Sequence, residues 1–300
     1  MPTINYHDNR SRTDTAYSDL QFFRTDRRGR VKAVSAENAG NVLYMGVEVE
    51  NDHYPYYCSN LDDAIAYVRE NASAFCRVES DGSLDNGFEI VSAPMTLAAH
   101  KVTDWAGLFA KLVEMGARAH DTDTCGLHVH VSRAALGNDD EAKRLCIAKI
   151  FELVERFQQH LSCFARRDIT ASQWCQPTEY GHSTSDGSRA LRRKAATVQD
   201  RQGFDVHDSR RYRAVNLQNP STIEFRLFKG TLKPDTFYAT ITLVDGIVRW
   251  CKQHTTPEVH TLTWDGLLAW INDDTLTAYW NTRKQYLSRF AAYNAASYVA

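Results

Sequence analysis

Charged side chains alternate with apolar ones in several short segments that have the composition of β-strands. Residues two apart on a strand project from the same face, so each segment places its charged residues side by side. The pairs formed in this way are Glu48 with Glu50, His128 with His130, and Glu224 with Arg226. In a further segment Glu89 lies alone between two apolar residues. Asp81 shares a face with Ser83 if the strand before it extends that far.

Such a face could simply meet solvent, which is the usual explanation for a single alternating strand. Solvent-facing strands normally mix Thr, Lys, Ser and Gln with both signs of charge, whereas these segments carry carboxylates, imidazoles and a guanidinium. Adjacent carboxylates such as Glu48 and Glu50 also repel each other unless a positive charge lies between them. A divalent cation supplies that charge, so the joint pattern predicts a metal site.

The types of ligand indicate which metal would bind. Carboxylate oxygens with one or two imidazoles suit Mg²⁺ or Mn²⁺, whereas a structural zinc site would need Cys and His. Mg²⁺ in proteins is usually held by a few carboxylates together with substrate phosphates. Arg226 follows Glu224 by two residues and could bind a phosphate oxygen bidentately. The pattern therefore predicts phosphoryl chemistry with a nucleotide.

The elements that would position these residues follow from the periodicity of the sequence. Extended runs are predicted at 42–50, 76–84, 88–94, 126–132, 212–218 and 222–230. Helices are predicted from Asn60 onward, and at about 98–115, 139–164, 235–254, 264–271 and 275–290. Because the strands come as hairpins or lie between helices, we expect an α+β fold, with an antiparallel or mixed sheet and helices packed on one face. No GxGxxG or GxxxxGK[ST] motif occurs, which argues against a doubly wound sheet.

Composition limits the class of protein. The 300 residues hold 35 Lys and Arg against 37 Asp and Glu, and the net charge of −2 argues against wholesale binding to nucleic acid or to an anionic membrane. No apolar run approaches the roughly 18 residues of a membrane span, and the polar N-terminus does not resemble a secretory signal. The seven cysteines form no CxxC pair, which argues against a disulfide scaffold or a zinc ribbon. We expect a reduced, cytoplasmic protein.

The chain has no linker that clearly separates two domains. Residues 1–40 are polar, with five basic side chains between positions 24 and 32, and we expect them to form a hairpin or an arm. Residues 41–300 are expected to form one domain, with the sheet in 41–232 and a helical C-terminal part in 233–300.

Four motifs, in this order, resemble those of the amidoligase family: GVEVE at 46–50, DGSL with FEIVSAP at 81–94, GLHVHVS at 126–132 and YRAVNLQNPSTIEFRLFKGTL at 212–232. That family belongs to the carboxylate–amine ligase superfamily of glutamine synthetase and γ-glutamylcysteine synthetase. The resemblance implies a fold like the glutamine synthetase catalytic domain. It also implies ATP- and Mg²⁺-dependent formation of an amide bond, in which ATP activates a carboxylate as an acyl phosphate and an amine then displaces phosphate.

The positions of the motifs imply a role for each residue. The resemblance implies a metal-binding set of Glu48, Glu50, Glu89, His128 and Glu224. Arg226 would bind phosphate, and His130 would approach the phosphates of the nucleotide. Arg213 and Asn216 fall where related enzymes place substrate or phosphate contacts. Asp81 falls where an acidic residue could orient the amine and accept its proton.

An acyl phosphate hydrolyses in water, so a ligase of this kind needs a cover over its site. The segment 168–210 lacks periodicity, and residues 166–213 carry a net charge of +4. It could be that cover or a solvated loop, and the sequence leaves both open.

The leading interpretation is a bacterial or phage cytoplasmic amidoligase whose substrates are a carboxylate and an amine of small molecules, peptides or proteins. A metal-dependent hydrolase or phosphotransferase could use the same carboxylate and histidine face, and a non-catalytic scaffold could retain the motifs. We expect neither nucleic acid nor a membrane as a partner, and a homo-oligomer remains open.

Overall fold

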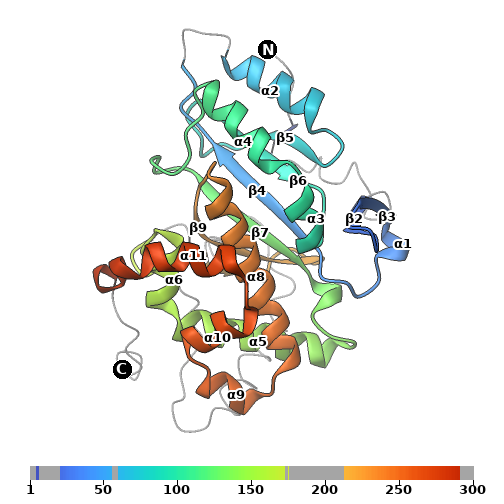
Figure 1. Cartoon of the computed structure of the whole chain (residues 1–300), viewed down its shortest axis with the longest axis vertical. Helices are drawn as coiled ribbons and strands as arrows, with labels where there is room; N and C mark the ends of the chain where they lie inside the picture. The colour runs from blue at the N-terminus through green and yellow to red at the C-terminus, as the bar shows by residue number, and fades with distance from the viewer. Residues whose placement is uncertain (1–4, 7–20, 56–59, 173–174, 176–212, 291–300) are drawn as a thin grey trace. The chain divides into compact units, whose positions relative to one another are not determined.

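Short β-branched segments and longer amphipathic ones form the strands and helices of an α+β fold (Figure 1). The computed structural model describes residues 5–6, 21–55, 60–172, 175 and 213–290. The chain divides into two compact units. The first unit comprises Met1–Val129 and Lys229–Tyr238, and the second comprises His130–Phe228 and Ala239–Ala300. The predicted combination of an antiparallel or mixed sheet with helices is confirmed.

The sheet of the first unit has the strand order β1-β5-β6-β4-β7. Its strands are β1 (Asn5–Tyr6), β4 (Met45–Asn51), β5 (Cys76–Ser80), β6 (Phe88–Ser92) and β7 (Gly126–Ser132, of which the residues from His130 belong to the second unit). The central β6 pairs antiparallel with both β4 and β5, whereas β1 pairs parallel with β5. The sheet is therefore mixed, with antiparallel strands at its centre.

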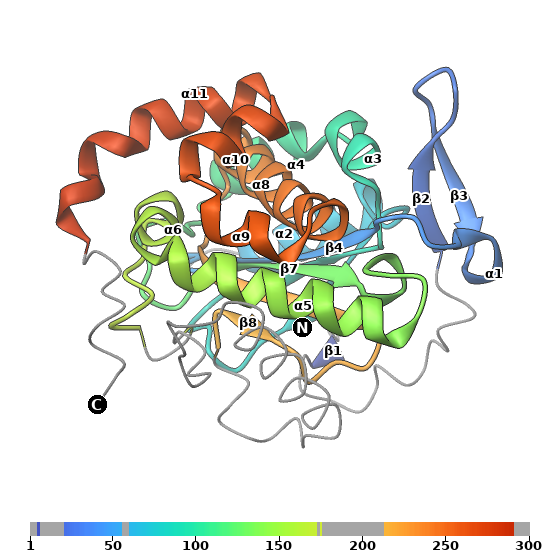
Figure 2. The ribbon, with the colours of Figure 1, turned by 90° about the horizontal axis from the view of Figure 1, so that it is seen from below.

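Three helices lie on one face of this sheet: α2 (Asn60–Asn71), α3 (Leu97–Val102) and α4 (Trp105–Glu114) (Figures 1 and 2). Between the helices and the strands lies an apolar core that includes Val47 and Val49 of β4. The prediction of one helix over 98–115 is wrong. Asp104 breaks it, because its side chain accepts a hydrogen bond from the N–H of Gly107 and so caps a new helix.

A buried carboxylate holds the loop between β5 and β6 against the end of β4. The Asp52 side chain accepts hydrogen bonds from the backbone N–H of Asp85 (3.0 Å) and Asn86 (2.7 Å), and from the hydroxyl of Thr124 (3.1 Å). The loop also passes so close to β4 that a Cβ on Gly87 would lie 2.0 Å from a backbone oxygen. The position therefore requires glycine.

The strand predicted over 76–84 is shorter than expected. β5 ends at Ser80, and Asp81 and Ser83 lie in the turn that follows. The Asp81 carboxylate accepts a hydrogen bond from the Ser83 N–H at 2.6 Å. This contact stabilises a turn in competition with a strand, so the predicted shared face of Asp81 and Ser83 is wrong.

The hairpin or arm expected near the N-terminus is a hairpin of β2 (Gln21–Thr25) and β3 (Val31–Ser35), followed by α1 (Ala36–Ala39) (Figure 2). Phe22 anchors it, because this buried ring packs edge-to-face on Tyr44 with 5.0 Å between the ring centroids. The backbone of Phe23 bonds to the segment after β6, donating to the Pro94 carbonyl and accepting from the Thr96 N–H, both at 2.9 Å.

The second unit is mostly helical. Its elements are η3 (Arg133–Ala135), α5 (Asp140–Arg156), α6 (Gln158–Ala165), β8 (Val215–Asn216), β9 (Thr222–Lys229, up to Phe228), α8 (Pro234–Gln253, from Ala239 onward), α9 (Thr256–Thr261), α10 (Trp264–Ile271), α11 (Asp274–Arg283) and η5 (Lys284–Arg289). The C-terminal tryptophans pack in its core, with 5.1 Å between the rings of Trp264 and Trp280.

The predicted elements of this unit differ from the structure in three places. The helix expected over 139–164 is interrupted at Phe157, whose φ of −97° and ψ of 18° end α5. Of the strand expected over 212–218, the residues that the structure describes form only β8, Val215–Asn216. Helix α9 was not predicted and lies between two predicted helices. The basic segment 168–210 lies almost entirely outside the described residues.

The described residues bear on two expectations from the composition, one about membrane-spanning helices and one about the cysteines. Among the helices of the described part of the chain, none combines the length and the hydropathy that crossing a membrane requires. Six cysteines fall within the described residues, and all six are buried as free thiols.

The hydrogen bonds that the Asp52 carboxylate accepts lead to a testable prediction for the stability of the fold. Burial raises the pKa of its carboxyl, but the bonds from Asp85, Asn86, His53 and Thr124 together outweigh burial and hold the pKa below its usual range. Its stabilising effect is therefore complete above the ordinary pKa of about 3.9 and is lost as the pH falls through the folded-state value. We expect Asp52→Asn to lower the free energy of unfolding near pH 7 by about 1–3 kcal/mol.

Urea unfolding at several pH values measures this effect. The difference between wild type and Asp52→Asn should shrink once the pH falls below the ordinary pKa. Asp123→Asn, an exposed carboxylate in the same loop as Thr124, is the matched control and should unfold like wild type. Equal stability of Asp52→Asn and wild type near pH 7 would contradict this account.

Candidate functional site

Three carboxylates lie in one row across the sheet of the first unit. Glu89 on β6 is directly opposite Glu50 on β4 and directly opposite Glu79 on β5. Their exposed fractions are 3% for Glu50, 0% for Glu89 and 3% for Glu79. Side chains in such positions have Cβ atoms about 4.5–5.5 Å apart, and like charges there repel. The row therefore favours a cation bound between the carboxylates.

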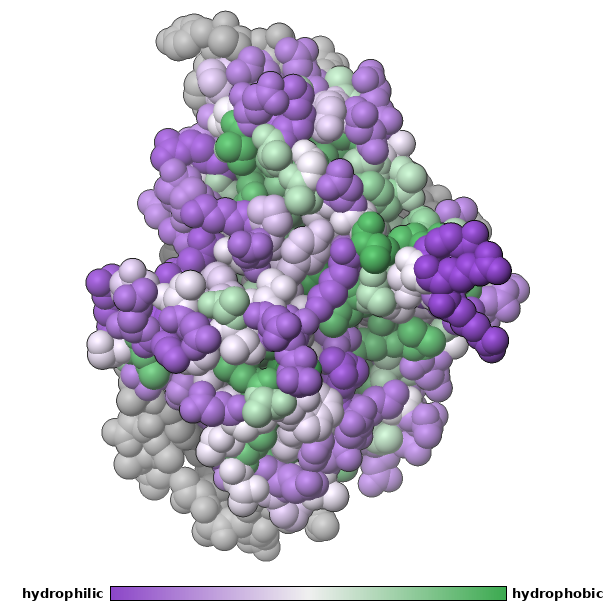
Figure 3. Space-filling model, viewed as in Figure 1, coloured by the Kyte–Doolittle hydropathy of each residue, from purple (hydrophilic) through white to green (hydrophobic). Residues whose placement is uncertain are grey.

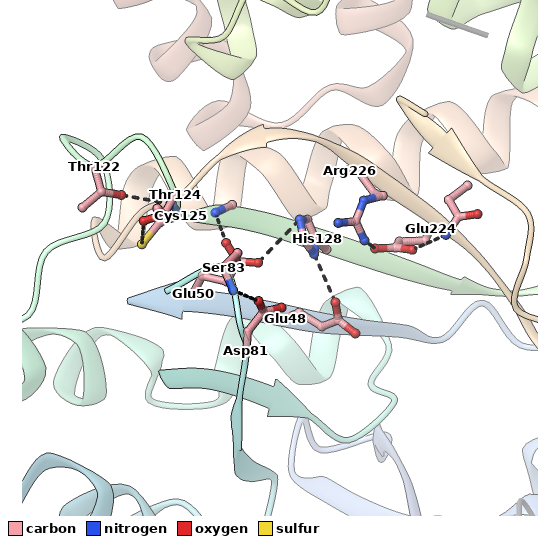
Figure 4. Close-up of polar contacts among 12 residues, drawn as sticks. Glu48, Glu50, Asp81, Ser83, Thr122, Thr124, Cys125, His128, Glu224 and Arg226 are labelled. Carbon is pink, nitrogen blue, oxygen red and sulfur yellow. Dashed lines mark hydrogen bonds and ion pairs between the residues drawn. The ribbon is translucent and has the colours of Figure 1, made fainter. Parts of the chain in front are cut away.

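A histidine on the neighbouring strand completes this cluster (Figure 4). Nδ1 of His128 lies 3.1 Å from Oε2 of Glu48, and its Nε2 lies 3.9 Å from Oε1 of Glu50. Glu50 also accepts a hydrogen bond from the backbone N–H of Gly126. One ligand atom each from Glu50, Glu89 and His128 lie within 4.8 Å of one another. This spacing suits coordination of a single metal ion.

The interpretation of these residues as a solvent-facing surface is wrong for the first unit. The side chains of Glu48, Glu50, Glu89 and His128 are all buried, although they project from the face opposite the apolar core. Both faces of β4 are therefore covered, and its burial pattern does not alternate. Burial makes repulsion between the carboxylates more costly than it would be in water.

Gly126 allows the close approach of β7 to this cluster. A Cβ at this position would lie 2.7 Å from Nε2 of His128 and 3.5 Å from Oε2 of Glu50. Any larger residue would displace the imidazole or the carboxylate, so the glycine of the GLHVHVS motif has a steric role here.

The second unit holds its own polar cluster around Glu224 on β9. Asn216, directly opposite on β8, donates from Nδ2 to Glu224 Oε2 at 2.8 Å, and the Arg226 guanidinium donates to Oε1. Nε2 of His130 lies 3.8 Å from Glu224 Oε1, while its Nδ1 lies 3.2 Å from the hydroxyl of Thr222. The buried Glu224 carboxylate thus holds the Arg226 guanidinium in one orientation.

The remaining predicted residues lie outside these clusters. Arg213 comes just before β8 and is half-buried. Asp81 belongs to the turn after β5, where its carboxylate caps the turn. Neither residue contributes to the groups of closely spaced ligand atoms found among the described residues.

Glu79 was not predicted from the sequence as a site residue. This carboxylate accepts a hydrogen bond from Nε of Arg77, two residues earlier on the same face of β5. The signal was present, because Arg77 and Glu79 alternate with Val78 in the way that Glu48 and Glu50 alternate with Val49. The predicted strand extended past Ser80, where β5 ends, so Asp81 in the turn was chosen as the acidic residue of this segment and Glu79 was not.

Cys125 directly precedes Gly126 and is a buried free thiol, so it is a candidate nucleophile by residue type. Burial raises its pKa to about 12, and the carboxylate of Glu50 acts in the same direction. The side chain is fully buried. A thiol that stays protonated and inaccessible is a packing residue.

Comparison with known proteins gives one family. The model of the family described as "Putative amidoligase enzyme" matches residues 30–248, which is most of the chain and includes every predicted site residue. A search of curated proteins finds no match.

The role of Gly126 is open to a direct test. We expect Gly126→Ala to fold but to bind Mn²⁺ about 10–100 times more weakly, because the new methyl group displaces His128 or Glu50. Calorimetric titration with Mn²⁺ measures the affinity, and circular dichroism checks the fold.

Gly266→Ala in α10 of the second unit is the matched control, since it adds the same methyl group away from the carboxylate row. Its Mn²⁺ affinity should equal that of wild type. An unchanged Mn²⁺ affinity in Gly126→Ala would show that this close approach is irrelevant to metal binding.

Proposed function

Because the chain belongs to the amidoligase family, we propose that it is an ATP- and Mg²⁺-dependent ligase that joins a carboxylate to an amine. One observation carries this proposal. Glu50 and Glu89 are buried directly opposite each other on neighbouring strands, and His128 has a ligand atom close to both. We further propose that the α+β fold is that of the glutamine synthetase catalytic domain, and that the enzyme works in the cytoplasm.

The donor set fits a hard divalent cation. Carboxylate oxygens dominate the cluster, and His128 is its single imidazole among the described residues of the first unit. Oxygen-rich sets of this kind suit Mg²⁺ or Mn²⁺. Glu50, Glu89 and His128 would hold the cation, and Glu48 would be a further ligand. The hydrogen bond between Glu48 and Nδ1 of His128 also orients the imidazole. Bound Mg²⁺ would neutralise charge that develops on a phosphoryl group during transfer.

In the proposed enzyme, the Glu224 cluster serves the same nucleotide. The support for this step is the family's order of motifs together with the contacts inside the second unit. Arg226 would bind a phosphate oxygen, and its contact with Glu224 fixes the guanidinium in advance. Glu224 would be a further metal ligand, held in place by Asn216. His130 would approach the phosphates, and Arg213 would contact phosphate or substrate.

Amide formation also requires proton transfer. An amine attacks the acyl phosphate only when it is neutral, so a nearby base must accept a proton directly or through water. Asp81 is the proposed base. Its carboxylate is half-buried at the end of β5, two residues beyond the Glu79 of the carboxylate row. The turn that it caps would hold it in a fixed orientation.

Product analysis distinguishes a ligase from a hydrolase or phosphotransferase with the same carboxylates. A ligase releases ADP only when both an amine and a carboxylate are present, whereas a hydrolase needs no amine. We expect ADP release by the whole chain to require Mg²⁺ and both substrates in a screen of amino acids, polyamines and acidic peptides.

The test variant is Glu50→Gln, and its control is Glu70→Gln. Glu50→Gln should reduce ADP release by a hundredfold or more, on the order of the loss when a charged group at a transition state is removed. Glu70→Gln changes an exposed glutamate on α2 and should leave the rate unchanged. ADP release that does not depend on an amine would contradict the ligase proposal, and so would full activity of Glu50→Gln.

A further inference from the structure

The β2–β3 hairpin of the first unit carries a dense and exposed positive charge. Residues 21–35 contain five basic side chains and one acidic side chain, that of Asp26, so their net charge is +4. The basic residues are Arg24, Arg27, Arg28, Arg30 and Lys32, and all five are exposed. Figure 3 shows the strongly hydrophilic surface that they give to this hairpin. The rest of the chain is net acidic, so the charge is local.

The turn of the hairpin is fixed by its one carboxylate. Asp26 Oδ1 accepts hydrogen bonds from the backbone N–H of Arg28 at 2.8 Å and of Arg30 at 3.0 Å. Its Oδ2 binds the Arg30 guanidinium, with 2.8 Å to Nη2. Gly29 completes the turn with a φ of +74°. A hairpin held in this way loses little conformational entropy when a partner binds.

Two of the cations face each other across the hairpin. Arg24 and Lys32 are directly opposite in the register of β2 and β3, and like charges in that position destabilise a strand pair. Carboxylates bound beside them would convert this repulsion into attraction. The arrangement is costly for the isolated hairpin and favourable in the presence of an anion.

Among the described residues, no strand pairs with the outer edge of β3. Phe23 on β2 directs its N–H and C=O away from β3, toward Pro94 and Thr96. Antiparallel pairs alternate, so Ala33, which is opposite Phe23, directs its own N–H and C=O away from β2. Val31 does the same by the period of two. Within the described residues, β3 pairs with β2 alone, and its side chains are mostly exposed.

We propose that this edge of β3 binds an extended acidic polypeptide segment as an added strand. Carboxylates at alternate positions of that segment would lie beside Lys32, with Arg24 on the same face one strand further away, and small apolar side chains would lie beside Val31 and Ala33. The basic side chains also discourage pairing with the same strand of a second copy. The inference goes beyond the ligase function and does not depend on it.

The edge geometry favours a polypeptide over a nucleic acid. A polypeptide backbone supplies both the N–H and the C=O groups that Ala33 and Val31 require, at the spacing of a strand. A nucleic-acid backbone supplies no such ladder. Charge alone would attract either polymer, so the test separates the contribution of the backbone from that of charge.

The probe is a fluorescent eight-residue peptide of alternating Glu and Val, titrated with the full-length protein and followed by anisotropy. We expect saturable binding that weakens as salt is added. Lys32→Glu combined with Arg24→Glu should weaken it roughly tenfold or more. The control, Lys111→Glu with Lys252→Glu, makes the same change in net charge elsewhere and should bind like wild type.

The backbone is tested with Ala33→Pro. Proline removes only the N–H that points to the free edge, so the bonds between β2 and β3 remain and the melting temperature should stay close to that of wild type. We expect peptide binding to be lost, while Ala33→Val keeps it. A Glu-Val peptide that is N-methylated at every Val should also fail to bind.

Three results would overturn the proposal. One is equal weakening by the hairpin and the control charge reversals. Another is full binding of the peptide by a folded Ala33→Pro protein, since charge without strand addition would then suffice. The third is tighter binding of duplex DNA than of the peptide with the same dependence on Arg24 and Lys32, which would assign the hairpin to nucleic acid.

Discussion

The repulsion among buried carboxylates in register is the constraint on which the rest of the first unit depends. Glu50, Glu89 and Glu79 lie opposite one another on three neighbouring strands, with almost no exposure to water. The sheet can hold them because its other face forms a large apolar core with α2, α3 and α4, and because Asp52 fixes the loop between β5 and β6. The stability gained from that core and loop, together with the ion pair between Arg77 and Glu79, offsets the cost of placing these carboxylates side by side. Strain of this kind is characteristic of a functional site.

The two polar clusters make different contributions to the proposed chemistry. In the first unit, oxygen ligands and one imidazole would hold a hard cation, and Gly126 leaves room for the side chains of His128 and Glu50. In the second unit, Glu224 and Asn216 contact each other, and Glu224 holds the guanidinium that would bind phosphate. A ligase needs both functions, because activation of a carboxylate requires neutralised phosphates and a held leaving group. Family membership and these contacts together support the proposed function.

The sequence predicted the strands of this site better than it predicted their surroundings. Alternation in 47-VEVE-50 and 127-LHVHV-131 identified β4 and β7, because strand periodicity depends only on local spacing. It could not reveal that both faces of β4 are buried, which depends on contacts far apart in the chain. Glu79 was missed because the Asp81 turn and the β5 strand compete over neighbouring residues. The break at Asp104 was similarly hidden, since a cap and an interior aspartate look alike until the N–H of Gly107 is seen to bond to it.

The most direct test of the central claim is the melting temperature of the whole protein, measured with Mg²⁺ and with EDTA, for wild type and for Glu89→Gln. Glu89 lies in the middle of the row, and glutamine keeps its shape while removing its charge. If these carboxylates form a metal site, Mg²⁺ raises the melting temperature of wild type by binding the folded state, and Glu89→Gln abolishes this rise. In EDTA the variant should then melt at a higher temperature than wild type, because repulsion across the sheet is reduced. A wild-type melting temperature that is indifferent to Mg²⁺, or an equal rise in Glu89→Gln, would contradict the claim that these carboxylates form a metal site.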